Sequence, residues 1–293
     1  MRVASRDADR DGVMSGFLTY DEIIAAISVN ARGQTYFFNK SMPASGAAGR
    51  IHSSWRRSGL PAAGTDPTAL TARVVDDSIT GALAFVNPTG GRTLHLLRAL
   101  AMSSAGSPMG TLILADRLLD YGVLDHNSNA QQNLTNDVSL ARYTDGKGVM
   151  AFLEVTTVLG GVAQNLSMNY DSDVSNGQTS VSIAMRTTAA VDEVPHGVNG
   201  VWIPLAAGDH GVKKVNHITF SAAGGGAGKS NLVLCKPLLE LPLLQAGVAS
   251  ERDLVMQIAS LPRLYDDHAL MWILVAAVSA TPVLFGSLGA AEN

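Results

Sequence analysis

The sequence predicts a mainly β protein: a jelly-roll-like antiparallel β-sandwich with a short N-terminal helix and a long extended N-terminal arm. Three observations support this class. Apolar and polar residues alternate with a period of two over 165–170 and 180–185, as in half-buried antiparallel strands. About ten segments after residue 92 have strand character and are separated by turns. No series of helices alternates with them, so a βαβ fold is excluded and a sandwich or barrel is favoured.

The chain is expected to divide into an N-terminal part, residues 1–92, and a β-sandwich domain, residues 93–293. Residues 30–92 are rich in Gly, Pro, Ala and Ser and contain only brief apolar pieces. A loop segment of this length is uncommon inside a compact domain unless it has a function or is disordered. We therefore expect an extended arm that is ordered by contact with another surface, most economically a partner subunit.

The arm begins with a helix signal. Thr19 and Glu22 form a capping box, in which the Thr19 hydroxyl accepts from the Glu22 N–H and the Glu22 carboxylate reaches back to Thr19. A short helix is expected over 20–28. A second helix is expected near 251–259, because Ser250 is a capping residue with Asp253 three residues later.

The strands of the sandwich are expected in the C-terminal two thirds of the chain. The Asn176-Gly177 pair suits the hairpin loop between two of them. The uncharged stretch 269–291 is long enough to cross a bilayer, but Pro282 interrupts it and no Lys or Arg follows it, so two buried strands are favoured. The expected strands are 93–102, 109–115, 149–158, 165–170, 180–185, 200–205, 212–220, 231–236, 270–278 and 283–288.

Charge is scarce and unevenly distributed. Only 16% of the residues are charged and the net charge is −4, whereas roughly 25% is usual for a soluble domain. Residues 23–65 contain five bases and no acid, while the remainder of the chain is acidic overall. We expect this basic segment to meet an acidic surface, either of its own chain or of a neighbour. A solvated arm with no binding role is the alternative.

Candidate binding residues lie in the basic segment. Trp55 stands beside two arginines, and tryptophan and arginine are favoured anchors of protein interfaces. The five bases are too sparse for a nucleic-acid site, and the rest of the chain is acidic. The predicted partner-binding residues are Arg32, Lys40, Arg50, His52, Trp55, Arg56 and Arg57.

Two motifs suggest ligands but are incomplete. Residues 223–230 mimic a phosphate-binding loop, yet Ala223 replaces its first glycine and a strand follows where a helix is required. We expect this loop to join strands 212–220 and 231–236. Residues 7–12 match the first half of a calcium loop, but Leu18 replaces the glutamate that completes it. No cofactor and no metal site are predicted.

No catalytic residue is predicted, and we expect a protein that is not an enzyme. Three histidines each follow an aspartate, but neighbours in a strand point to opposite faces, so turn or surface positions are favoured. Paired carboxylates are expected to be solvated turn residues, and a glycosidase that uses them is the enzymatic alternative. Cys235 is expected to lie in the core. The His and Asp residues concerned are His126, His210, His268, Asp76, Asp77, Asp171 and Asp173.

Five stretches carry a family resemblance: 16–24, 50–56, 140–144, 250–254 and 261–266. Together they resemble a group of tailed-bacteriophage virion structural proteins, with similarity from about residue 14 to the end. The resemblance implies a capsid decoration (cement) protein, a class that is often trimeric and often built on β-sandwiches.

These observations lead to the hypothesis of a non-enzymatic decoration protein on the capsid surface of the virion. Its expected partners are the major capsid protein and further copies of itself, with a trimer favoured, and neither nucleic acid nor a membrane. A tail or head-to-tail connector protein is one alternative. A carbohydrate-binding β-sandwich of a receptor-recognition structure is another, although the three Trp and six Tyr residues form no cluster in the sequence.

Overall fold

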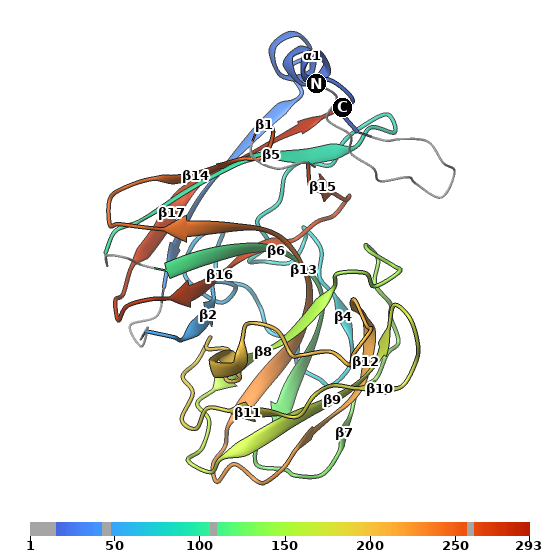
Figure 1. Cartoon of the computed structure of the whole chain (residues 1–293), viewed down its shortest axis with the longest axis vertical. Helices are drawn as coiled ribbons and strands as arrows, with labels where there is room; N and C mark the ends of the chain where they lie inside the picture. Colours follow the sequence, from blue (N-terminus) through green and yellow to red (C-terminus); the bar gives the residue numbers. More distant parts are fainter. Residues whose placement is uncertain (1–15, 43–47, 106–109, 257–260) are drawn as a thin grey trace.

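The computed structural model describes residues 16–42, 48–105, 110–256 and 261–293, which form three antiparallel β-sheets stacked along the long axis of the molecule (Figure 1). We call them the upper, central and lower sheets. The mainly β class predicted from the sequence is confirmed. The calcium-loop-like residues 7–12 lie outside the described residues.

The upper sheet is built from both ends of the chain. Strand β1 pairs with β17 along its whole length, so residues from the predicted arm lie beside the last strand of the protein. The strand order is β14 (Ser250–Asp253), β5 (Leu94–Ser103), β17 (Val283–Glu292), β1 (Gly33–Ser41) and β3 (Gly59–Leu60), with β15 (Arg263–Leu264) also paired to β5.

The central sheet connects the two ends of the molecule. Its two long strands, β6 and β13, run beside each other from the middle of the molecule toward its lower end in Figure 1. Pro237 of β13 lies at one of three register shifts in this pairing, a position where a strand tolerates proline. The strand order is β2 (Ile51–Ser53), β16 (Leu270–Ala276), β6 (Gly110–Asp125), β13 (Lys229–Leu243) and β8 (Met150–Thr157), with β4 (Arg73–Val74) paired to β6.

The lower sheet contains the period-two segments that the sequence identified. Leu166, Met168 and Tyr170 of β9 are buried, and the residues between them are not. The strand order is β10 (Gln178–Thr179), β9 (Gln164–Ser172), β12 (Val212–Phe220) and β7 (Gln132–Asn133), with β11 (Ile183–Met185) also paired to β9.

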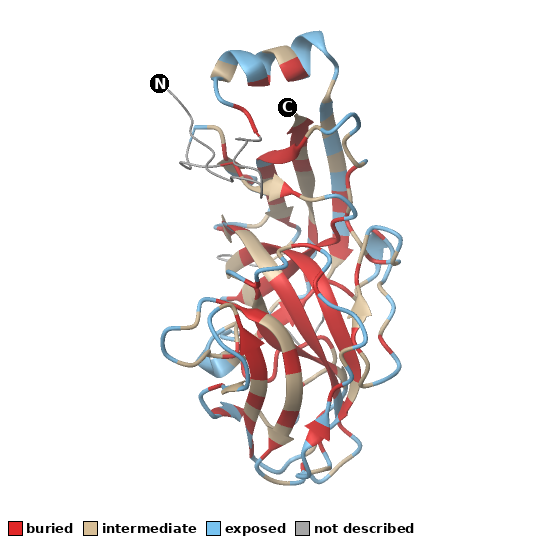
Figure 2. Ribbon diagram, turned by 90° about the vertical axis from the view of Figure 1, so that its right-hand side faces the viewer, coloured by how far each residue is buried: buried red, intermediate tan, exposed pale blue. Residues whose placement is uncertain are grey.

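Three hydrophobic clusters hold the sheets together, and the central sheet contributes to each of them. The first joins its upper half to the upper sheet, and the second joins its lower half to the lower sheet. The third lies on its remaining face, which is covered by the segment around Trp55 and Val75 and by residues around Val194. Figure 2 shows the buried residues concentrated along these sheets.

The N-terminal helix forms as expected. Helix α1 (Tyr20–Ile24) has both hydrogen bonds of the predicted capping box, and it continues into a π-helical turn, η1 (Ala25–Val29). The helix expected over 251–259 is wrong for 251–256: Ser250–Asp253 form β14, paired with β5, and a turn follows. Residues 257–260 lie outside the described residues.

The structure also corrects the strand predicted over 200–205 and the extended arm predicted over 30–92. Residues 200–205 form no strand, although Ile203 is buried and its N–H donates to the carbonyl of Ala151. They follow a single 3₁₀ turn, η2 (Gly197–Asn199). Residues 30–92 contribute β1 to β4 to the upper and central sheets of the same chain. The boundary at residue 92 stays a prediction.

The uncharged C-terminal stretch forms two strands, β16 and β17, as expected. Within the described ranges, no helix combines the length and the apolar character needed to cross a membrane.

We expect Phe38→Ala to lower the free energy of unfolding by about 3–5 kcal/mol, the usual cost of a large core truncation. Phe38 is buried on the inner face of β1, with its ring centre 5.3 Å from that of Trp272. Val86→Ala, in the same predicted arm but at a side chain 74% exposed, is the control and should change stability by less than about 0.5 kcal/mol. Urea denaturation measures both, and equal effects would contradict the placement of β1.

Candidate functional site

Trp55, the proposed interface anchor, lies inside the molecule. It is fully buried, its indole N–H donates to the carbonyl of Thr65 at 3.3 Å, and the guanidinium carbon of Arg117 lies 4.6 Å from its ring centre. Gly64 packs so closely on the ring that a side chain there would collide with it. Trp55 therefore fastens the N-terminal segment to the central sheet of its own chain.

The arginines next to Trp55 also meet acids of their own chain. Arg57 contacts Asp192 at 2.6 Å, and Arg56 contacts Asp192 at 3.5 Å and Asp66 at 2.9 Å. Burial, together with the charge of Glu154, raises the pKa of Asp192, while the two arginines oppose this shift. The basic segment is expected to meet acids either of its own chain or of a neighbour. In the structure, Arg56 and Arg57 meet acids of their own chain.

Glu193 extends this contact. Its carboxylate accepts two hydrogen bonds from Arg186, at 2.6 and 2.8 Å, and lies 3.8 Å from Arg50. His52 forms a β-bridge with Glu193 and is fully buried. Burial lowers the pKa of the His52 imidazole to about 4, although the charge of Glu193 acts in the opposite direction.

The two remaining candidates lie on β1 or next to it. Lys40 is buried, and its ammonium group donates to the carbonyls of Arg57 and Ala62 at 3.0 and 3.2 Å. Burial lowers the pKa of Lys40 to about 8. Arg32 lies before the other end of β1, where it donates to the carbonyl of Asn293 at 3.4 Å. Of the seven predicted partner residues, Lys40, His52 and Trp55 thus have buried side chains.

Beneath Trp55 lies a buried ionic network that the sequence did not reveal. Arg117 of β6 donates to Asp120 at 3.0 and 3.1 Å and to Glu154 at 3.1 Å, and all three side chains are fully buried. Arg73 adds a bidentate contact to Asp120 at 2.8 and 2.9 Å. Burial alone would lower the pKa of Arg117, but the charges of Glu154 and Asp120 outweigh it and raise the pKa.

A second buried ion pair joins Asp116 of the same strand to Arg142, which lies on a loop. Arg142 binds both carboxylate oxygens of Asp116, at 2.9 and 3.0 Å, and donates to the carbonyls of Val75 and Arg117. Asp116 also accepts from the N–H of Ala269 at 2.9 Å. Arg142 thereby joins the loop that carries it to β6 and to the segment around Val75, and Asp116 links this pair to Ala269.

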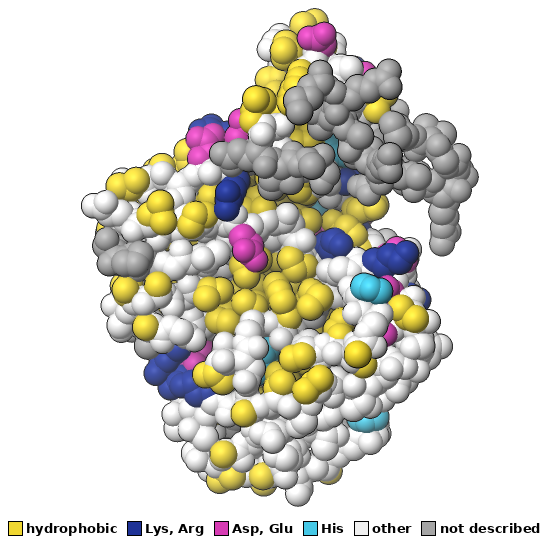
Figure 3. Space-filling view, viewed as in Figure 1, with side chains coloured by type: hydrophobic (Ala, Val, Ile, Leu, Met, Phe, Trp, Pro, Cys, Tyr) yellow, Lys and Arg dark blue, Asp and Glu magenta, His cyan; other side chains and the backbone are white. Residues whose placement is uncertain are grey.

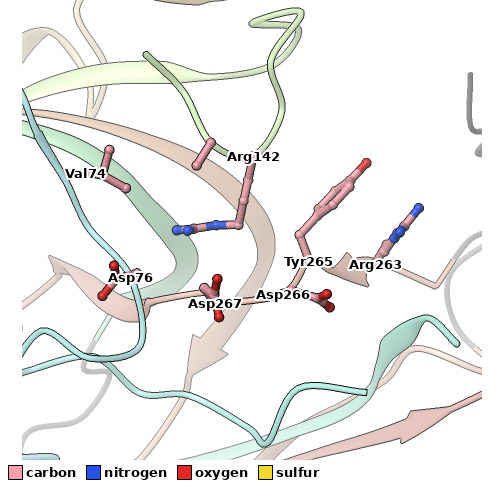
Figure 4. A pocket seen from close by; sticks show the side chains of 8 residues that line it. Val74, Asp76, Arg142, Arg263, Tyr265, Asp266 and Asp267 are labelled. Carbon is pink, nitrogen blue, oxygen red and sulfur yellow. The ribbon is translucent and has the colours of Figure 1, made fainter. Parts of the chain in front are cut away.

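A pocket of about 340 Å³ opens above this pair (Figure 4). Its carboxylates are engaged locally: Asp76 accepts from Ser78, and Asp267 accepts from Asn87 at 2.6 Å. Such contacts are typical of turn residues, as expected for Asp76. The pocket is lined by Val74, Asp76, Ala141, Arg142, Arg263, Tyr265, Asp266 and Asp267.

The other predicted carboxylates also lie in polar contacts. Asp171 accepts from Asn216, Gly177 and Lys214; although burial acts against the shift, these contacts lower its pKa. Asp173 accepts from the N–H of His210 at 2.8 Å. Within the described residues, no group of three His, Cys, Asp or Glu side chains is arranged to hold a metal ion.

His126 lies in a turn, as predicted, although its side chain is buried; the prediction of surface or turn histidines is wrong for His268, which is buried and lies outside a turn. His126 contacts the Ser230 hydroxyl at 2.8 Å and stacks on Phe220, with 4.2 Å between ring centres. His268 accepts from the N–H of Phe85 at 2.9 Å. The Ser230–His126 pair is enclosed by the core, so it supports packing rather than nucleophilic chemistry. His210 is exposed, as expected.

The glycine-rich loop joins two strands, as expected. The N–H of Gly224 donates to the carbonyl of His126, and the carbonyl of Gly224 accepts from the N–H of Val162, while Lys229 begins β13. No helix N-terminus follows the loop, so the arrangement that holds a phosphate group is missing from this described segment. Cys235 is buried in the core, and burial raises the pKa of its thiol.

Comparisons with known proteins were made at three levels. No family model matches the chain, and no curated protein matches it. Among solved structures, it is similar to the infectious bursal disease virus Gt strain at 9% identity and a TM-score of 0.18, covering 92% of this chain and 86% of that one. Similarity to the VP2 subviral particle of that virus has 10% identity, a TM-score of 0.19 and coverage of 92% and 85%. At these TM-scores the likeness carries no argument about function.

We expect Arg117→Met to lower the free energy of unfolding by about 3–5 kcal/mol, because Asp120 and Glu154 would remain as buried charges. Adding Glu154→Gln should recover part of this loss, since one of the two charges is then removed. Arg98→Met is the control, because Arg98 forms an exposed pair with Glu251. Urea denaturation distinguishes these outcomes, and a double variant no more stable than Arg117→Met would contradict the network.

Acid should destabilise the fold between pH 6.5 and pH 4. Burial lowers the pKa values of His52, His126 and His196 to about 4, so the unfolded chain binds more protons in this interval. Stability is therefore complete above pH 6.5 and is lost as the pH falls, by about 2 kcal/mol per histidine at pH 5. Melting temperatures across this range measure the slope. His126→Gln should reduce it, and an unchanged slope would contradict a role for this buried imidazole.

Proposed function

We propose that this chain is a non-enzymatic capsid decoration protein of a tailed bacteriophage, located on the capsid surface of the virion, where it binds the major capsid protein lattice and stabilises the head. The proposal rests first on the resemblance of five sequence stretches to phage virion proteins. Self-association, with a trimer favoured, belongs to the same proposal.

The single observation that supports this proposal is the position of the resembling stretches in the fold. Residues 50–56 contain Trp55 and Arg56, which contacts Asp192, and residues 140–144 contain Arg142, which binds the buried Asp116. These are residues that hold the N-terminal segment and the central sheet together. Their presence supports a fold shared with the phage proteins, because such buried pairs are costly to leave incomplete.

The lattice contact is proposed at the upper end of the molecule. The α1–η1 end carries exposed apolar side chains, Ile24, Ile27 and Val29, followed by the partly exposed Arg32. Figure 3 shows hydrophobic side chains gathered at this end. Exposed apolar groups next to an arginine are suited to a protein interface. Arg32 is thus the member of the predicted partner set that lies nearest to this contact.

Many weak contacts, one set for each bound copy, would together stabilise the capsid. A decoration protein bound at many equivalent positions adds contact area across the boundaries between capsid subunits. Avidity between copies then makes the shell harder to open without any single strong contact. The carboxylates and histidines described above have structural contacts, which supports a role that needs no catalysis.

Val29→Glu should weaken binding to capsids at least tenfold, because it places a charge in the proposed apolar contact. Val198→Glu is a matched control, since both valines are exposed, by 78% and 67%, and both lie in short helical turns. The measurement is co-sedimentation of purified protein with capsids that lack it. Equal binding of the two variants would contradict the contact, and a copy number far below that of the capsid subunits would favour the tail or connector alternative.

A further inference from the structure

Among the described residues, one edge of β1 has a neighbouring strand only at its C-terminal end. β1 pairs with β17 from Gly33 to Ser41, whereas on its other side β3 reaches only Asn39 and Lys40. Within the described residues, the backbone of residues 33–38 therefore has a free side. In Figure 2, β1 lies along the right-hand margin of the upper sheet.

The nearby chain at Val86 is not a strand partner of this edge. The side-chain amide of Gln34 donates to the Val86 carbonyl at 3.0 Å and accepts from the Val86 N–H at 2.8 Å. These bonds use the Gln34 side chain, which projects from a face of the sheet, and they leave the β1 edge groups unused. The neighbouring Phe85 is buried and contacts the ring of Tyr36.

The free edge has none of the usual devices that prevent strand pairing. Natural edge strands are protected by lysine, proline, a bulge or a cover. Residues 33–38, Gly-Gln-Thr-Tyr-Phe-Phe, contain no charge and no proline, and their pairing with β17 has no register shift. Thr, Tyr and Phe favour extended structure. Phe37 is 67% exposed on the outer face of this strand.

The direction of the backbone groups identifies which residues can pair. The N–H of Ser41 donates to the Ser58 carbonyl, toward the side on which β3 lies. Backbone groups alternate sides along a strand, so Gly33, Thr35 and Phe37 direct their N–H and C=O groups toward the free edge. Three residues with this orientation allow a short antiparallel ladder.

We propose that β1 pairs with β1 of a second copy of this chain, antiparallel about a two-fold axis that passes between the two Thr35 residues. This register places Phe37 of each copy opposite Gly33 of the other. Gly33 has no side chain, and Ile27 lies 3.5 Å from the position a Cβ would occupy there. Ile27 therefore covers Gly33, and Phe37 of the second copy packs against the exposed side of the Ile27 side chain.

The charge distribution supports a second copy as the occupant. In a two-fold pairing, a charged residue near the axis faces its own equivalent, and like charges directly opposite are destabilising. Residues 33–39 carry no charge, so this penalty is absent. Each copy also supplies both an exposed aromatic ring and the glycine opposite it, a combination known to stabilise cross-strand pairs.

The inference goes beyond the proposed function and does not require it. A two-fold contact through β1 is distinct from the three-fold contact of a trimer, and it shares Ile27, but neither Ile24 nor Val29, with the proposed lattice contact. If all of them form, two-fold pairing links neighbouring trimers. If capsid binding fails while the β1 pairing is observed, only the proposed function is overturned.

Sedimentation velocity over a concentration series tests the pairing. The full-length protein should show a concentration-dependent dimer, and Phe37→Lys should weaken it at least tenfold. Val181→Lys, at an exposed valine of the segment after β10, is the matched control and should dimerise like the unmodified chain. Circular dichroism confirms that both variants are folded. Absence of a dimer, or equal dimerisation of the two variants, overturns the inference.

Cross-linking tests the register. Hydrogen-bonded antiparallel partners have Cα atoms about 5.5 Å apart, which is within the range of a disulfide. Thr35→Cys should therefore form a disulfide-linked dimer on mild oxidation. Cys235 is the single native cysteine and is buried, so it gives no background. Val181→Cys is the control, and cross-linking that is no faster at residue 35 than at residue 181 overturns the register.

Discussion

The buried charge of Arg117 is the constraint on which much of this structure depends. It lies on β6, the strand shared by the upper and lower halves, and water does not reach it. A guanidinium group in such a position must be paired, because an isolated buried charge costs several kcal/mol. Asp120 and Glu154 provide the pairing, and the Trp55 ring covers the guanidinium. The segments that carry these groups therefore have to fold together.

The same constraint explains how an acid-free N-terminal segment is held. Arg56 and Arg57 of this segment contact Asp192, and Arg73, which follows the segment, contacts Asp120. Exposed pairs of this kind contribute little, but these carboxylates are buried, so leaving them unpaired would be destabilising. The low overall charge of the chain then has a further consequence for its surface. Many of its charged groups are used inside the molecule, and the surface that remains is unusually neutral.

The sequence predicted the strands whose pattern is local and missed those that depend on distant partners. Period two was sufficient for β9, because one face of that strand is buried. Of the strand predicted over 180–185, only Ile183–Met185 form β11, and Val181 is exposed. β1 escaped notice since Gly33 and Pro43 bound a short run within a Gly- and Ser-rich region, although its Thr-Tyr-Phe-Phe core was the available signal. Ser250 and Asp253 resemble a helix start, but pairing with β5 overrides that local preference.

The sequence predicts which residues of the basic segment make contacts, but it does not predict which residues they contact. Trp55 and the arginines beside it are predicted to be contact residues, and in the structure they contact other residues of their own chain. Sequence alone could not distinguish an acid on a neighbouring subunit from Asp192, which is remote in the chain and close in the fold. Because Asp192 belongs to the same chain, its contacts with the arginines leave no basic surface for assembly there. A surface for assembly is therefore sought among exposed residues that are uncharged and have no partner within the described chain. The exposed turn at Val29 and the free edge of β1 are such places, and both belong to the upper end of the molecule.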